Sequence, residues 1–97
     1  MARRTYNMVL MVNGRLINEI VIDPHYEKKH SDIDDTLILE LVRKLDGREF
    51  AASERVGEFE FFMLDRIQHG EKLYRLVWCM HDHSMYIGVI NAFRRSK

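Results

Sequence analysis

The chain has 97 residues, of which 46% are hydrophobic and 31% charged, and its 15 basic side chains balance 15 acidic ones. A chain of this length is expected to form one domain, because either half alone would be too small to bury a core. The composition excludes a disordered protein, and the zero net charge argues against the broad basic surface of most nucleic-acid-binding domains.

The sequence also bears on the location of the protein in the cell. The chain opens with no signal peptide, and no apolar run approaches the roughly 18 residues of a membrane span. The single cysteine, Cys79, cannot form an internal disulfide, and its apolar surroundings are typical of a buried small hydrophobe. We therefore expect a cytoplasmic protein that makes no membrane contact.

The first expected element is a β-hairpin in residues 6–23, YNMVLMVNGRLINEIVID. Asn13-Gly14 separates two β-favouring runs, and this pair tolerates the positive φ angles of a type I′ turn. Pro24 should end the second strand because it offers no backbone donor. The polar segment 25–30, HYEKKH, then leads to the next element.

A helix is expected after this segment. Ser31 is a candidate N-cap, with Asp34 three residues on in the position of a capping-box acid. Gly47 would end the helix. The apolar side chains that follow one helical face are Ile33, Leu37, Ile38, Leu41, Val42 and Leu45.

Three further strands are expected at 58–67, 73–80 and 84–93, after a polar stretch at 46–57. Because the connections between strands are short, neighbouring strands should be antiparallel. The predicted fold is a single α+β domain, residues 1–97, with an antiparallel sheet of about five strands and one main helix in the order ββαβββ.

The histidines raise the question of a metal site. His81-Asp82-His83 would place two imidazoles on one side of a strand, but a zinc site needs three or four converging ligands. The sequence also contains no glycine-rich phosphate loop and no dinucleotide-binding fingerprint. We therefore expect neither a metal nor a cofactor.

The segment HYEKKH is rich in groups that suit RNA cleavage. This reaction needs groups that move protons from the 2′-hydroxyl and to the leaving oxygen, and cations that stabilise the phosphorane. His25 and His30 suit proton transfer because the histidine pKa lies near neutrality, and Lys28 and Lys29 supply positive charge. The alternative interpretation is a solvated loop before a helix.

Arg75 lies inside a predicted strand, on the face that it shares with Leu73, Val77 and Cys79. The other face carries Tyr74, Leu76, Trp78 and Met80 and has the character of a core. A partly apolar face with an arginine could hold a ribose-phosphate segment. It could equally receive a peptide of a partner protein, with Arg75 reaching past it to water.

Residues 74–95, YRLVWCMHDHSMYIGVINAFRR, resemble the closing hairpin of the RelE/ParE-like toxins of bacterial toxin–antitoxin pairs. Members of that superfamily commonly end with a Tyr-Arg-Leu/Ile-Val-Tyr strand, a polar turn, a β-rich strand and a Lys/Arg pair. The matching residues are Tyr74, Arg75, Leu76, Val77, Trp78, Asp82, Val89, Ile90, Arg94 and Arg95. Residues 25–50 are similar to the BrnT-like ribonuclease toxins, in which a histidine-containing segment precedes one helix and three antiparallel strands.

The resemblance implies a ribonuclease that cleaves messenger RNA, often on the ribosome, and that an antitoxin protein neutralises. It implies phosphate-binding or catalytic roles for Arg75 and Arg95, and we assign proton transfer to a histidine, with His25, His30, His81 and His83 as candidates. Lys28, Lys29 and Arg94 are the expected RNA-binding residues.

Three features depart from the family pattern: a β-hairpin opens the chain in place of a helical hairpin, no tyrosine follows Arg95, and the net charge is zero, whereas these toxins are usually basic. Tyr26 or Tyr86 would have to replace that tyrosine. The alternative hypothesis is a non-enzymatic protein-interaction module on the same fold, for example a homodimer.

Overall fold

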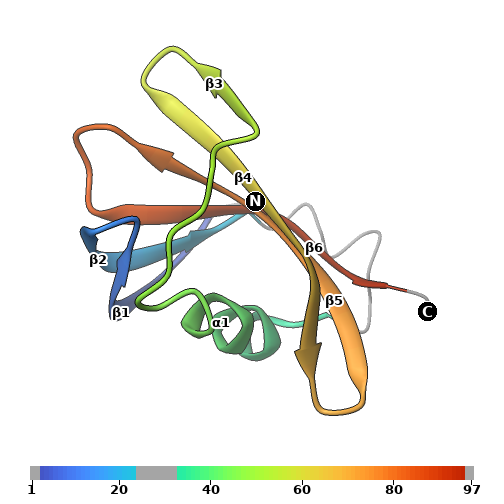
Figure 1. Ribbon diagram of the computed structural model, residues 1–97. Helices are drawn as coiled ribbons and strands as arrows, with labels where there is room; N and C mark the ends of the chain where they lie inside the picture. The colour runs from blue at the N-terminus through green and yellow to red at the C-terminus, as the bar shows by residue number, and fades with distance from the viewer. Residues whose placement is uncertain (1–2, 24–32, 96–97) are drawn as a thin grey trace.

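A six-stranded sheet organises the residues that the computed structural model describes, 3–23 and 33–95 (Figure 1). The one helix in these residues, α1 (Asp35–Arg43), lies on one face of the sheet. The spatial order is β1-β2-β6-β5-β4-β3, in which β2 and β6 run parallel and every other pair is antiparallel. The strands are β1 (Arg4–Val12), β2 (Arg15–Ile22), β3 (Glu54–Val56), β4 (Phe59–His69), β5 (Lys72–His81) and β6 (Tyr86–Arg95).

The predicted fold class, an α+β domain with a five-stranded antiparallel sheet in the order ββαβββ, is wrong. The sheet has six strands and is mixed, and α1 is a short helix of nine residues on a mainly β structure. Short connections set the direction only of strands that follow one another in the chain, whereas β2 and β6 are separated by α1 and three strands. The missing strand, β3, has three residues that are all exposed, so no hydrophobic alternation marks it.

The predicted hairpin is confirmed, and its turn has a second role. Asn13 and Gly14 adopt φ angles of 57° and 72°, between the antiparallel strands β1 and β2. The Asn13 side chain also donates to the carbonyl of Phe50 (3.1 Å) and accepts from the Phe50 N–H (2.6 Å). The turn therefore anchors the segment that follows α1.

The N-cap residue of α1 differs from the expected one. Asp34 is the N-cap, and its carboxylate accepts a hydrogen bond from the Leu37 N–H at 2.9 Å. Ser31, the expected cap, lies outside the described residues. In the first turn, Asp35 accepts hydrogen bonds from the Arg4 guanidinium and from the Tyr6 hydroxyl, which joins the helix to β1.

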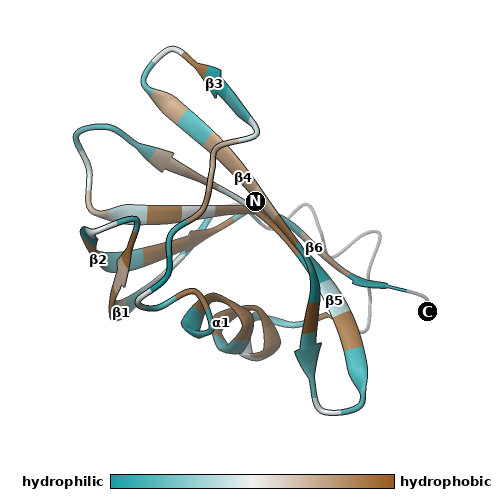
Figure 2. Ribbon diagram, in the orientation of Figure 1, coloured by the Kyte–Doolittle hydropathy of each residue, from teal (hydrophilic) through white to brown (hydrophobic). Residues whose placement is uncertain are grey.

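The core lies between α1 and one face of the sheet. As expected, Tyr74, Leu76, Trp78 and Met80 of β5 all point into it. Trp78 stacks on Phe62 with ring centroids 5.4 Å apart, and Phe50 meets its edge at 5.2 Å. Figure 2 shows that hydrophilic residues gather instead at the tip of the β4–β5 hairpin. Among the described residues, no helix has the length and apolar character of a membrane span.

Candidate functional site on the uncovered face of the sheet

The face of the sheet opposite α1, here called the uncovered face, carries the sequence-predicted arginines. α1 lies against the other face only (Figure 1). Strand alternation sends every second side chain of β4, β5 and β6 to the uncovered face, where these side chains are half-buried or exposed. Its central residues are Phe59, Phe61, Met63 and Asp65 of β4, Leu73, Arg75, Val77 and Cys79 of β5, and Phe93 and Arg95 of β6.

Two arginines from neighbouring strands meet one carboxylate on this face. Arg75 Nη2 donates to Asp65 Oδ2 at 3.1 Å, and Arg95 Nε lies 3.0 Å from Asp65 Oδ1. The second contact is an ion pair without the alignment of a hydrogen bond. The Arg75 guanidinium also lies over the Phe93 ring, 5.3 Å from its centroid, in a cation–π contact. We call Asp65, Arg75, Phe93 and Arg95 the arginine cluster.

The arginine cluster keeps a net positive charge. The pKa of Asp65 lies below its usual value of 3.8, chiefly because Arg75 donates a hydrogen bond to the carboxylate, so Asp65 is ionised at neutral pH. Two guanidinium groups and one carboxylate sum to a charge of +1. Each guanidinium has five N–H donors, and Asp65 engages only part of them. With side chains 27% to 33% exposed, both arginines remain accessible to a bound anion.

A β-bulge in β4 positions Asp65. The pairing of β4 with β5 shifts between Leu64 and Ile67, and Arg66 within this shift adopts a left-handed φ of 58°. The Asp65 carboxylate also accepts the Arg66 N–H at 2.9 Å. Sequence reasoning missed Asp65, although the adjacent pair Asp65-Arg66 interrupts an otherwise apolar strand, which is a signal for a bulge.

His81 does not join the arginine cluster. It lies six residues beyond Arg75 on β5, which is roughly 20 Å along an extended strand. Both of its ring nitrogens have partners: Nε2 lies 3.1 Å from a Glu58 carboxylate oxygen, and Nδ1 lies 3.2 Å from the Ser84 hydroxyl and accepts the His83 N–H. His81 therefore cannot move a proton at a phosphate bound by Arg75 and Arg95.

The other predicted residues fall elsewhere. Arg94 pairs with Tyr74 across the β5–β6 ladder, so its side chain points to the face that α1 covers, opposite to Arg75 and Arg95. His25, Lys28, Lys29 and His30 lie outside the described residues.

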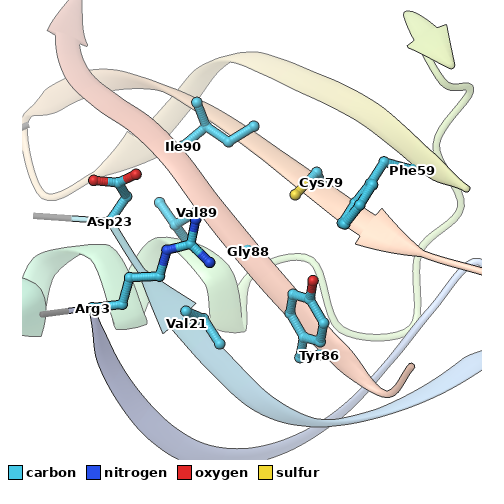
Figure 3. A pocket seen from close by; sticks show the side chains of 9 residues that line it. All are labelled: Arg3, Val21, Asp23, Phe59, Cys79, Tyr86, Gly88, Val89 and Ile90. Atoms are coloured by element: carbon cyan, nitrogen blue, oxygen red, sulfur yellow. The ribbon is translucent and has the colours of Figure 1, made fainter. Parts of the chain in front are cut away.

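A hollow of about 130 Å³ opens on the same face above Gly88 (Figure 3). Gly88 stands opposite Cys79, and a Cβ on it would come within 3.0 Å of the Cys79 sulfur. Arg3 and Asp23 lie at one end of the hollow and Tyr86 at the other, as Figure 3 shows. Cys79 is thus half-buried rather than fully buried, and this burial raises the pKa of its thiol, which disfavours the nucleophilic thiolate.

Within residues 3–23 and 33–95, no three side chains of the metal-binding types come together as a metal site would require. A comparison with protein-family models, with curated proteins and with solved structures gives no match to this chain. The chemistry of the uncovered face is therefore the basis for a functional assignment.

Proposed function

We propose that this protein is a small RNA-cleaving toxin of the RelE/ParE-like type, in which the arginine cluster binds the scissile phosphate. The observation that supports this function is the convergence of Arg75 and Arg95, from adjacent antiparallel strands, on one carboxylate of the uncovered face. A second polypeptide, the antitoxin, would neutralise the activity, and messenger RNA, free or on the ribosome, is the proposed substrate.

The chemistry of the cluster suits a phosphodiester. A phosphate presents paired oxygens to a guanidinium in the way that a carboxylate does, and arginine binds both through parallel N–H donors. The unused donors and the net charge of +1 favour the additional negative charge that develops on the phosphorane. The half-buried apolar residues beside the cluster, such as Phe93, offer a surface for the ribose and base.

The proton transfers of the proposed reaction need another group. His81 is too far along β5 to act at this phosphate. In this proposal the role falls to His25 or His30, which the sequence places in one polar segment beside Lys28 and Lys29.

The decisive experiment uses purified protein in a cell-free translation extract, with new 5′ ends mapped on one reporter message. We expect discrete cuts, and we expect Arg75→Ala to slow cleavage on the order of 100-fold, the usual effect of removing one transition-state donor. Arg55→Ala is the matched control: Arg55 also forms an ion pair, with Asp82 at 2.8 Å, but it lies on β3 away from the cluster.

Two results would overturn the proposal. One is a folded wild-type protein that leaves the message intact in the extract. The other is a folded Arg75→Ala protein that cuts as fast as Arg55→Ala. Circular dichroism of each variant shows whether a loss of cleavage reflects chemistry or unfolding.

A second candidate function, a protein-interaction module, is favoured by exposed apolar side chains near the β1–β2 hairpin. Met11 and Leu16 pair across the two strands and are 43% and 48% exposed, and Val9 is 72% exposed. Apolar side chains gathered on a surface are typical of contact sites for other proteins. Light scattering tests the homodimer form of this function, since a monomer at micromolar concentration contradicts it.

A further inference from the structure

A second group of cations surrounds a hollow beside the bulge of β4. The hollow has a volume of about 260 Å³, and Lys44, Arg48 and Arg66 line it together with Gln68. These cations come from three separate places: Lys44 is the C-cap of α1, Arg48 follows the helix, and Arg66 is the left-handed residue of the bulge. The sequence pattern marked none of them as a site residue, because Arg66 joins Lys44 and Arg48 only in the folded chain.

The charge of this hollow is not neutralised by the described residues. Within residues 3–23 and 33–95, Lys44, Arg48 and Arg66 form no ion pair with a carboxylate. Asp65 also lines the hollow, but its carboxylate is held by Arg75 and Arg95 on the uncovered face. The hollow therefore differs from the surface ion pairs, in which each arginine already contacts a carboxylate.

The backbone of Arg66 supports a functional role. A residue with a side chain is strained at a φ of 58°, where glycine or asparagine is the usual choice. Strain of this kind is found at binding and catalytic sites, which makes this position a candidate for a functional role. Arg48 is held over the Phe50 ring at 5.0 Å, which limits the freedom that it would lose on binding a ligand.

The size and chemistry of the hollow define the ligand. A volume of about 260 Å³ is below that of a site for a drug-sized molecule, which is about 300 Å³ or more, but it admits a single tetrahedral anion. Guanidinium and ammonium groups are the usual partners of phosphate oxygens, and the carboxylate of Asp65, which also lines the hollow, is already held by Arg75 and Arg95. Since Asp65 and Arg66 are consecutive, this hollow and the arginine cluster meet at the same bulge.

We infer that the hollow lined by Lys44, Arg48 and Arg66 is a second phosphate-binding site, which holds the RNA backbone at a nucleotide next to the one bound by Arg75 and Arg95. The inference rests on the proposed function, since it takes single-stranded RNA as the ligand. The RNA would cross the edge of β4 at the bulge, where β4 extends beyond the three residues of β3 that pair with it.

The test measures binding of a labelled single-stranded oligouridylate by fluorescence anisotropy over a series of salt concentrations. The variants are Arg66→Asn, which suits the left-handed backbone without the charge, and Lys44→Gln. Arg43→Gln is the control, because Arg43 is an exposed cation next to Lys44 that does not line the hollow. We expect each variant to weaken binding several-fold more than the control and to reduce the log–log salt slope by about 0.7, the value for one phosphate contact of a single strand.

The outcomes separate this inference from the proposed function. If Arg75→Ala weakens RNA binding but Arg66→Asn and Lys44→Gln behave like Arg43→Gln, the second site is wrong and the arginine cluster stands. If Arg66→Asn weakens binding while folded wild-type protein leaves messages uncut, the site stands and the ribonuclease assignment fails.

If the wild-type protein binds no RNA, titration with inorganic phosphate followed by NMR shows whether the hollow binds phosphate at all. Shifts at Arg66 and Lys44 that disappear in Arg66→Asn would assign the hollow to a free phosphate compound instead of RNA. An absence of shifts would overturn the inference.

Discussion

At the scale of single residues, the carboxylate of Asp65 links the function of the uncovered face to the stability of the protein. Its two arginine partners stabilise the ionised form, which is why the pKa of Asp65 lies below 3.8 in the folded state. The ion pairs therefore stabilise the fold at any pH above 3.8, and this contribution is lost as the pH falls through the lower, folded-state pKa.

Asp65→Asn tests this argument. We expect the variant to melt at a lower temperature than the wild type at pH 7, and the difference to shrink as the pH falls below 3.8. Thermal melting followed by circular dichroism over this pH range is the measurement, with Glu71→Gln, at an exposed turn residue, as the control. A difference that stays constant with pH would show that the ion pairs of Asp65 do not carry the effect.

At the scale of elements, one side chain joins the β1–β2 hairpin to the segment after α1. Asn13 supplies the left-handed backbone of the turn and makes two hydrogen bonds with the backbone of Phe50. Phe50 in turn packs on Trp78 in the core. The turn residue thus contributes to packing as well as to the local reversal of the chain.

Substitution of Asn13 separates these two contributions. Asn13→Gly keeps the left-handed turn but removes both side-chain hydrogen bonds, so we expect a loss of about 1–3 kcal/mol in the free energy of unfolding. Asn13→Asp keeps the acceptor for the Phe50 N–H and should lose less. Urea denaturation gives both values, and a glycine variant as stable as the wild type would contradict the second role of Asn13.

At the scale of the whole molecule, the sheet has one packed face and one face without a described layer above it. Phe62 and its neighbour Phe61 on β4 show the contrast: Phe62 is 1% exposed and stacks on Trp78, whereas Phe61 points to the uncovered face and is only half-buried. Packing against α1 should therefore carry most of the stability.

Substitution of Phe62 and of Phe61 tests how much each face of the sheet contributes to stability. Phe62→Ala should lower the free energy of unfolding by about 3–5 kcal/mol, because it leaves a cavity in the core. Phe61→Ala should lower it clearly less, since water reaches this position already. Guanidinium denaturation of the two variants measures the difference, and equal losses would mean that the uncovered face is packed as tightly as the core.

The parts of the fold that were predicted correctly depend on short stretches of chain. The Asn13-Gly14 turn follows from two adjacent residues, and the core face of β5 follows from the alternation of Tyr74, Leu76 and Trp78. The errors concern longer distances or weak local signals: the parallel direction of the β2–β6 pair, the short exposed strand β3, and the first residue of α1. Hydrophobic periodicity reports which face of a strand is buried, but not which strand lies beside it.

For the candidate sites, too, local features could be predicted from the sequence, whereas long-range contacts could not. The amino-acid sequence alone was sufficient to place Arg75 on the half-buried face of its strand, because side chains alternate along an extended backbone. Only the tertiary structure could bring Asp65 between Arg75 and Arg95, separate His81 from them, and surround a hollow with Lys44, Arg48 and Arg66. These arrangements depend on the bulge of β4 and on the packing of α1 against the sheet, which bring together residues far apart in the chain, and no local backbone preference specifies them.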